Sequence, residues 1–223
     1  MKRRKTSLGF TLVEILIAVF IFGILVTIVF ASFNTIVGKN EIIDESITIF
    51  EMGNNCLNRM IVDLHAIYVP VYSGDSGSES FDDMSDVYRV VGGTSFLEGD
   101  DFPNLEFTSL GHVPLKKNNR YGIARIVYYV QAADDGNYLL RRSDNLYPYQ
   151  PFEPKKSDPV LCEQVKSLAF KYYDREGTEY EFWDSGSEEF KYAIPSAIAI
   201  KIEIGNDSVF HMFETKVSIP VSR

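Results

Sequence analysis

The feature of this sequence that most limits its fold is an uninterrupted apolar run near the N-terminus. Residues 10–33 read FTLVEILIAVFIFGILVTIVFASF and contain one ionisable group, Glu14. As an α-helix this run would measure roughly 36 Å, which exceeds the ~30 Å hydrocarbon core of a bilayer. A carboxylate within such a run is costly, and it therefore points to a functional role with a specific partner. The run predicts a membrane-spanning helix that carries one specialised acidic residue.

The charge distribution orients this helix. Four basic residues, Lys2, Arg3, Arg4 and Lys5, precede it, although the whole chain has a net charge of −9. By the positive-inside rule they keep the N-terminus in the cytoplasm and send residues 34–223 across the membrane. Two simpler interpretations are a cleaved signal peptide, whose apolar part is only about 7–15 residues long, and a plain signal anchor. Neither explains Glu14. The negative charge also argues against nucleic acid as a partner.

A second helical pattern follows the apolar run. Apolar residues recur at alternating spacings of four and three, interrupted only by Asn54. The stripe consists of Ile43, Ile47, Phe50, Asn54, Leu57, Ile61, Leu64 and Tyr68. It predicts an amphipathic helix that extends to Tyr68, stops before Pro70 and packs against the core of a soluble domain. A separate coiled-coil partner is the alternative. Asp63 falls off the stripe, and Cys56 is placed on the polar side of this helix.

The remainder of the chain is typical of an antiparallel β domain. Residues 71–102 are expected to be mostly loop. Segments rich in branched and aromatic residues, separated by turn residues such as Gly136 and Gly177, then predict strands. The expected strands are 123–130, 138–142, 165–173, 179–183, 198–204 and 208–219. The fold class is therefore α+β: a long N-terminal helix, half transmembrane and half amphipathic, packed on an antiparallel β-sheet head. Phe170, Tyr172 and Trp183 are expected in the core.

The sequence contains no pattern that predicts catalysis. The motifs G-x-S-x-G and H-E-x-x-H are absent, so we expect neither an enzyme nor a bound cofactor. Acidic residues at 82–86 and 100–101 provide the oxygen ligands that calcium prefers, but without EF-hand spacing. We expect them to be solvated loops and predict no metal site.

Two cysteines leave one covalent possibility open. Cys56 and Cys162 are the only cysteines in the chain. In an oxidising compartment they could form a disulfide that closes a long loop. Their separation in space does not follow from the sequence, so the pairing stays undecided at this point.

The first 14 residues resemble a known processing signal. Residues 2–14 read KRRKTSLGFTLVE and are similar to the class III leader of type IV pilins and type II secretion pseudopilins. In that family a prepilin peptidase cuts after the glycine and methylates the new N-terminus. The resemblance implies cleavage between Gly9 and Phe10, N-methylation of Phe10 and removal of the four leader charges. Glu14 would become the fifth mature residue and set the assembly register by pairing with an α-amino group.

The head resembles one member of that family in particular, the J minor pseudopilin. The similarity lies in LAFKYYD at 168–174, Trp183, AIPSAI at 193–198 and the hairpin at 126–142, with Asp63 near the helix end. Ile194 and Ser196 depart from the family pattern, and so do residues 181–182. The resemblance implies a pilin-like fold and a structural role in the tip complex that primes a type II secretion pseudopilus.

The same resemblance implies partners and a location. The expected partners are minor pseudopilins I, K and H, major pseudopilin G, the prepilin peptidase, the inner-membrane assembly platform and membrane lipid. We expect a single-pass inner-membrane protein of a Gram-negative bacterium with a periplasmic head. The expected segments are a leader at 1–9, a transmembrane or filament-core helix at 10–33, an amphipathic helix at 34–70 and a β-rich head at 71–223. A minor type IV pilin acting in assembly, adhesion or DNA uptake is the alternative, because the leaders are equivalent.

Overall fold

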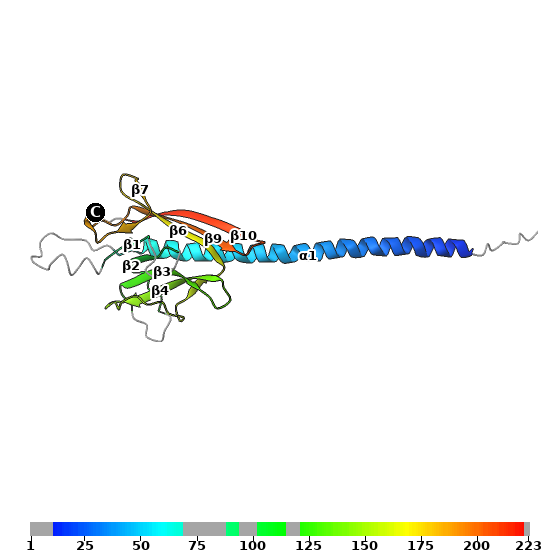
Figure 1. Ribbon diagram of the computed structural model, residues 1–223, viewed down its shortest axis with the longest axis horizontal. Coiled ribbons are helices and arrows are strands. Elements are labelled where there is room, and N and C mark those ends of the chain that lie inside the picture. Colours follow the sequence, from blue (N-terminus) through cyan, green and yellow to red (C-terminus); the bar gives the residue numbers. More distant parts are fainter. Residues whose placement is uncertain (1–10, 69–87, 94–101, 115–120, 221–223) are drawn as a thin grey trace, which may run out of the picture. The chain divides into compact units, whose positions relative to one another are not determined.

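A computed structural model of the chain describes residues 11–68, 88–93, 102–114 and 121–220, without the side chains of residues 33–42. The chain divides into two compact units, Met1–Ser46 and Ile47–Arg223. Helix α1 covers Leu12–His65 and contributes to both units. All of the strands belong to the second unit (Figure 1).

The strands form two antiparallel sheets. The six-stranded sheet has the order β5-β4-β3-β2-β1-β8, and the four-stranded sheet has the order β10-β9-β6-β7. The first comprises β1 (Val91–Gly92), β2 (Leu105–Ser109), β3 (Ala124–Ala132), β4 (Tyr138–Leu146), β5 (Val160–Cys162) and β8 (Trp183–Asp184). The second comprises β6 (Val165–Tyr173), β7 (Glu179–Tyr180), β9 (Ala197–Gly205) and β10 (Phe210–Ser218). A short 3-10 helix, Glu188–Phe190, follows β8. The predicted α+β class is confirmed.

Most of the predicted strands are present, with one division that the sequence did not indicate. The segment predicted as a single return strand at 179–183 serves both sheets. Its first part, β7, pairs with β6, whereas Trp183 begins β8 and pairs with β1. The sequence also did not predict β2, and β1 lies in the stretch expected to be loop. The head therefore contains two sheets that are connected through the Trp183 segment.

Helix α1 ends earlier than predicted. Its last residue is His65, three residues before Tyr68. Ile67 forms a β-bridge with Ser109, and the Tyr68 N–H donates to the Thr108 carbonyl at 3.0 Å. The chain leaves the helix where these hydrogen bonds with the end of β2 replace the helical ones. Pro70, which was predicted to stop the helix, lies outside the described residues.

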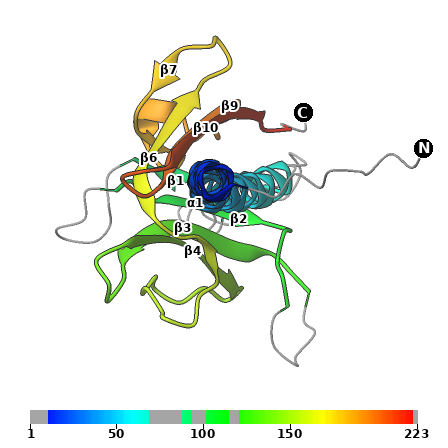
Figure 2. The same cartoon turned by 90° about the vertical axis from the view of Figure 1, so that its right-hand side faces the viewer.

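Within the second unit, α1 lies between the two sheets (Figure 2). The predicted stripe describes its buried face only in part. Leu57 and Leu64 are buried, but Ile43, Ile47 and Phe50 are each more than half exposed. The buried positions of this helix are Ile49, Gly53, Cys56, Leu57, Met60, Asp63 and Leu64. Because sheets cover it on two sides, its buried arc is wider than a single stripe and is turned away from Phe50.

The close approach of α1 to β10 depends on Gly53. A Cβ at this position would lie 2.3 Å from the Phe213 ring, which is itself buried. Alanine would gain about 1 kcal/mol of helix propensity, but overpacking costs about 1–3 kcal/mol. We expect Gly53→Ala to lower the free energy of unfolding by up to about 2 kcal/mol, measured by urea titration of Trp183 fluorescence. In a Phe213→Leu background the same change should become neutral or stabilising. A stabilising effect in the otherwise unchanged chain would contradict this packing.

Candidate functional site

The first turn of α1 contains Glu14, the acidic residue predicted to act in assembly. The Thr11 N–H and the Thr11 hydroxyl donate to the same Glu14 carboxylate oxygen at 3.0 and 2.9 Å. In return, the Glu14 N–H contacts the Thr11 hydroxyl oxygen at 3.4 Å. This reciprocal arrangement is a capping box, which satisfies N–H groups that have no partner in the first turn. Glu14 therefore has a local role in starting the helix that the sequence interpretation missed, although the pattern T-x-x-E indicates it.

The segment that follows is apolar and unburied. Leu12–Ser32 has a mean hydropathy of 3.0 and is long enough to cross a membrane. Of the sites predicted around it, Lys2, Arg3, Arg4, Lys5, Gly9 and Phe10 lie outside the described residues. The structure places only Glu14, at the start of an exposed apolar helix.

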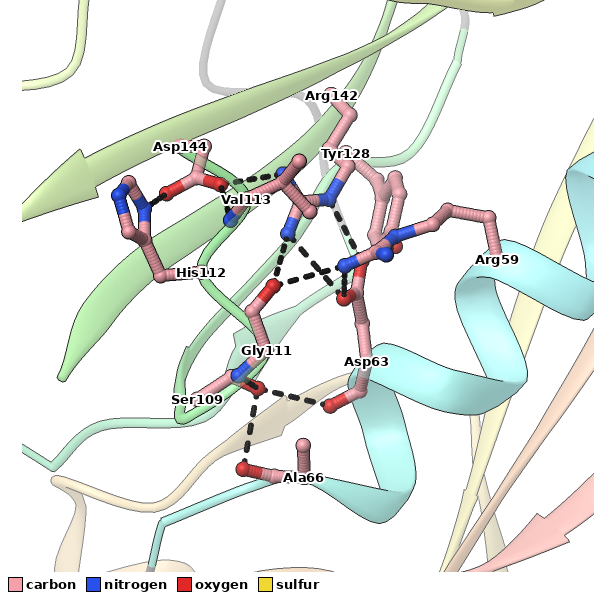
Figure 3. Close-up of polar contacts among 10 residues, drawn as sticks. All are labelled: Arg59, Asp63, Ala66, Ser109, Gly111, His112, Val113, Tyr128, Arg142 and Asp144. Carbon is pink, nitrogen blue, oxygen red and sulfur yellow. Dashed lines mark hydrogen bonds and ion pairs between the residues drawn. The ribbon is translucent and has the colours of Figure 1, made fainter. Parts of the chain in front are cut away.

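A second cluster of polar residues lies where α1 ends in the second unit, around the fully buried carboxylate of Asp63 (Figure 3). Arg142 of β4 donates to it through Nε at 2.6 Å and through Nη2 at 3.2 Å. Arg59, one turn earlier in α1, donates through Nε at 3.2 Å and also through Nη2. The Tyr128 hydroxyl of β3 donates to the same carboxylate. One acidic side chain thus connects α1 to two strands.

The loop after β2 completes the connection. The Gly111 carbonyl accepts hydrogen bonds from Nη2 of Arg59 at 2.8 Å and from Nη2 of Arg142 at 3.0 Å. The Ser109 hydroxyl donates to the Asp63 carbonyl at 3.0 Å and is 3.1 Å from the Ala66 carbonyl, and it accepts from the Gly111 N–H at 2.9 Å. The Asp63 carbonyl belongs to the last turn of α1 and the Ala66 carbonyl follows it directly, where backbone acceptors lack helical partners.

A second carboxylate balances the charge of the cluster. Asp144 accepts from Arg142 Nη1 at 2.6 Å and from the Val113 N–H at 3.0 Å, and it contacts His112 Nδ1 at 2.6 Å. Burial alone would raise the pKa of Asp144, but these hydrogen bonds and the charge of Arg142 hold that pKa below its ordinary value. The cluster then pairs two guanidinium groups with two carboxylates.

The surroundings also determine the protonation states of Arg142 and Tyr128. Burial would lower the pKa of Arg142, but hydrogen bonds and charges from Asp63 and Asp144 raise it, so the guanidinium stays charged. Burial, reinforced by the negative charge of Asp63, raises the pKa of Tyr128 well above its ordinary value. Tyr128 therefore remains a neutral hydrogen-bond donor. We call the set Arg59, Asp63, Tyr128, Arg142 and Asp144 the helix clamp.

The helix clamp corrects the placement of Asp63. The predicted stripe left Asp63 outside the expected buried face of the helix, whereas Asp63 is fully buried because the six-stranded sheet covers that side. An acidic side chain near a helix C-terminus is disfavoured by the helix dipole. Two arginines and a hydroxyl offset that cost. The chemistry of the clamp is structural, since all of its groups are engaged in attaching α1 to the head.

The two cysteines lie side by side. Cys56 of α1 and Cys162 of β5 are each 1% exposed, and their sulfurs are 3.4 Å apart as free thiols. The placement of Cys56 on a polar helix side is therefore wrong. Among the described residues no three metal-ligating side chains gather in one place, and the acidic stretches at 82–86 and 100–101 lie outside them.

The first part of helix α1 is apolar and long enough to span a membrane, and the last part of the same helix belongs to an antiparallel α+β unit. This combination defines a pilin-like class of protein. The model of the prokaryotic N-terminal methylation motif matches residues 4–30. The model of type II secretion system protein J matches residues 32–213, most of the chain. No curated protein matches. The chain belongs to the type II secretion protein J family and is a single-pass membrane pseudopilin.

Proposed function

We propose that this pseudopilin occupies the tip complex of a type II secretion pseudopilus, together with minor pseudopilins I and K, and primes assembly of the filament. Major pseudopilin G, minor pseudopilin H, the prepilin peptidase and the inner-membrane assembly platform are its further partners. The observation that supports this most is the presence of the methylation motif and the protein J head in one chain. The type IV pilin alternative loses support because the matching head family is a secretion family. The role is structural rather than enzymatic.

In the proposed assembly, the apolar segment Leu12–Ser32 and the head have different roles. Leu12–Ser32 presents apolar side chains on all sides, and these need either lipid or neighbouring helices. Removal of the four leader cations would allow this helix to leave the bilayer along its axis. The helix clamp would meanwhile transmit any displacement of α1 to the head. We assign residues 1–9 to the leader, 10–33 to the membrane or filament core, 34–65 to the amphipathic part of helix α1 and the residues after it to the head, in the periplasm of a Gram-negative cell.

Processing at Gly9–Phe10 tests the first step. We expect mass spectrometry of the chain from native membranes to show an N-methylated N-terminus at Phe10. Gly9→Leu should retain residues 1–9, because a side chain at this position obstructs the approach of the peptidase to the backbone. A mature chain that still begins at Met1 would contradict the proposal.

The proposed role of Glu14 in pseudopilus assembly can be separated from its role in helix capping by three variants. If the carboxylate pairs with an α-amino group, both Glu14→Ala and Glu14→Gln should reduce incorporation into pseudopili at least tenfold, with normal cleavage. Glutamine retains the capping box, which accepts Glu or Gln. Thr11→Ala is the matched control, because it removes the hydroxyl of the capping box and keeps the charge. Assembly that survives Glu14→Gln but fails with Thr11→Ala would assign Glu14 to helix capping alone.

The partner assignment needs the full-length chains. Co-expressed I, J and K chains, extracted from membranes in mild detergent, are expected to purify as one complex through a tag on this chain. The control replaces this chain with major pseudopilin G carrying the same tag. Recovery of this chain without I and K, under conditions in which I and K still bind each other, would refute the tip assignment.

A further inference from the structure

The two cysteines lie between helix α1 and the six-stranded sheet, which the helix clamp also joins, but at a different position along the helix. Cys56 lies on α1 seven residues before Asp63, which corresponds to about two helical turns. Cys162 ends β5, the strand at one of the two edges of the six-stranded sheet. The helix clamp uses β3 and β4, so the cysteines add a contact between α1 and the outermost strand of the same sheet.

The geometry suits a covalent bond. The sulfurs are 3.4 Å apart, and a disulfide requires about 2.05 Å, so only a small movement of each side chain is needed. Both thiols are buried and have each other as hydrogen-bond partner. The two residues are separated by 106 positions in sequence, so the loop they would close is long.

From this geometry we infer that Cys56 and Cys162 form a disulfide that fastens helix α1 to strand β5 of the exported head. The inference rests on the proposed export of the head, because disulfides persist in oxidising compartments. The oxidant is a protein thiol–disulfide oxidoreductase of that compartment. One cysteine thiolate attacks the oxidant's disulfide, and the second cysteine then displaces the oxidant. The two thiols lose two electrons and two protons, an S–S bond forms, and the oxidant becomes a dithiol.

The environment of the thiols determines when the bond forms. The hydrogen bond to Cys56, together with burial, raises the pKa of the Cys162 thiol far above its ordinary value. Because the thiolate is the attacking species, a folded and reduced chain oxidises slowly. The disulfide therefore forms while the chain folds after export, before α1 and β5 close over the sulfurs. Once formed and buried, it resists reduction by small thiols.

The experiment counts thiols in the full-length chain. Cells are quenched in acid, and the chain is denatured and treated with N-ethylmaleimide before and after reduction. We expect no labelled cysteine before reduction and two after it. The oxidised chain in detergent should melt roughly 10 °C or more above the reduced chain. The Cys56→Ala/Cys162→Ala chain is the control, and its melting temperature should not respond to reductant. Two labelled cysteines before reduction, in a chain whose head is digested by protease added to spheroplasts, would overturn the inference.

A second arm separates this inference from the proposed topology. The purified, reduced full-length chain is incubated with a glutathione redox pair in detergent, with and without urea. We expect the loss of two hydrogens in its mass, and faster loss with urea, because opening the core releases the thiols. If the disulfide forms neither with urea nor without it, the inference is refuted, regardless of the side of the membrane on which the head lies. A bond that forms in detergent, in a chain whose head is protected from protease in spheroplasts, would instead refute the proposed export.

Discussion

Replacing Asp63 with alanine is expected to destabilise the second unit by about 3–5 kcal/mol, the largest effect that we expect of a single substitution in this chain. The change leaves Arg142, which is 3% exposed, and the Tyr128 hydroxyl without their shared acceptor. Removing one partner of a buried ion pair costs this much because the remaining charge stays buried. Since domains are stable by only about 5–15 kcal/mol, a large part of the chain should be unfolded or degraded. Urea titration followed by Trp183 fluorescence measures the loss.

Two further variants test the reason for this loss. Asp207→Ala is the matched control: it removes a carboxylate that is 3.1 Å from Lys166 but fully exposed, and it should change stability very little. Adding Arg142→Met to Asp63→Ala should restore part of the lost stability, because it removes the buried guanidinium whose Nε has lost its acceptor, while Asp144 keeps the Val113 N–H and His112 as partners. Equal losses for Asp63→Ala and Asp207→Ala would contradict the burial of the helix clamp.

The elements that were predictable from the sequence are those whose pattern is local. Ile198, Ile200, Ile202 and Ile204 alternate with more polar residues, and all four are fully buried in β9 as their period of two predicts. The apolar run at 10–33 is equally direct, since its length and composition alone satisfy the requirement for a membrane span. Such patterns depend on one face of one element and need no information about its neighbours.

The helix clamp and the cysteine pair were not predictable in this way. Positions 49, 53, 56, 60, 63 and 67 also follow a helical spacing, but the stripe includes a glycine, a cysteine and an aspartate. Its burial depends on both sheets, whose strands lie more than 20 residues further along the chain. Arg59 and Asp63, four residues apart, have the spacing of an ordinary surface ion pair. The partners on the strands, Tyr128 of β3 and Arg142 of β4, which lie 65 and 79 positions from Asp63, distinguish a buried site from an exposed one.

The Thr11–Glu14 capping box is a different case. Its four-residue pattern is present in the sequence and forms without any tertiary contact. The apolar surroundings of Glu14 suggested that it pairs with an α-amino group, whereas the Thr11 N–H and hydroxyl of its own turn already bind it. In the proposed assembly, the Glu14 carboxylate would be hydrogen-bonded by Thr11 while the helix is in lipid and would pair with an α-amino group in the filament. Because it would have a partner in both states, the free-energy cost of moving the helix from lipid to its neighbours would be lower.

The stability of the second unit is expected to fall steeply above about pH 10, for a reason that lies in its buried tyrosines. Burial raises the pKa of Tyr128, Tyr129 and Tyr172, with nearby carboxylates contributing at Tyr128 and Tyr129. Groups whose pKa is raised on folding contribute stability that is fully present below their unfolded pKa of about 10. Above that pH the unfolded chain releases three protons that the folded chain retains. The free energy of unfolding should then decrease by about 4 kcal/mol per pH unit from these residues.

Tyr172→Phe tests this prediction with little risk to the fold. Its hydroxyl is buried and has no hydrogen-bond partner among the described residues, so its removal should leave stability at neutral pH unchanged or raise it by about 1 kcal/mol. The slope above about pH 10 should become shallower by about 1.4 kcal/mol per pH unit. Tyr192→Phe, at a ring that is 66% exposed, is the matched control and should leave the slope unchanged. Urea titrations at several alkaline pH values measure both slopes, and an unchanged slope for Tyr172→Phe would contradict the burial of this hydroxyl beside Gly92.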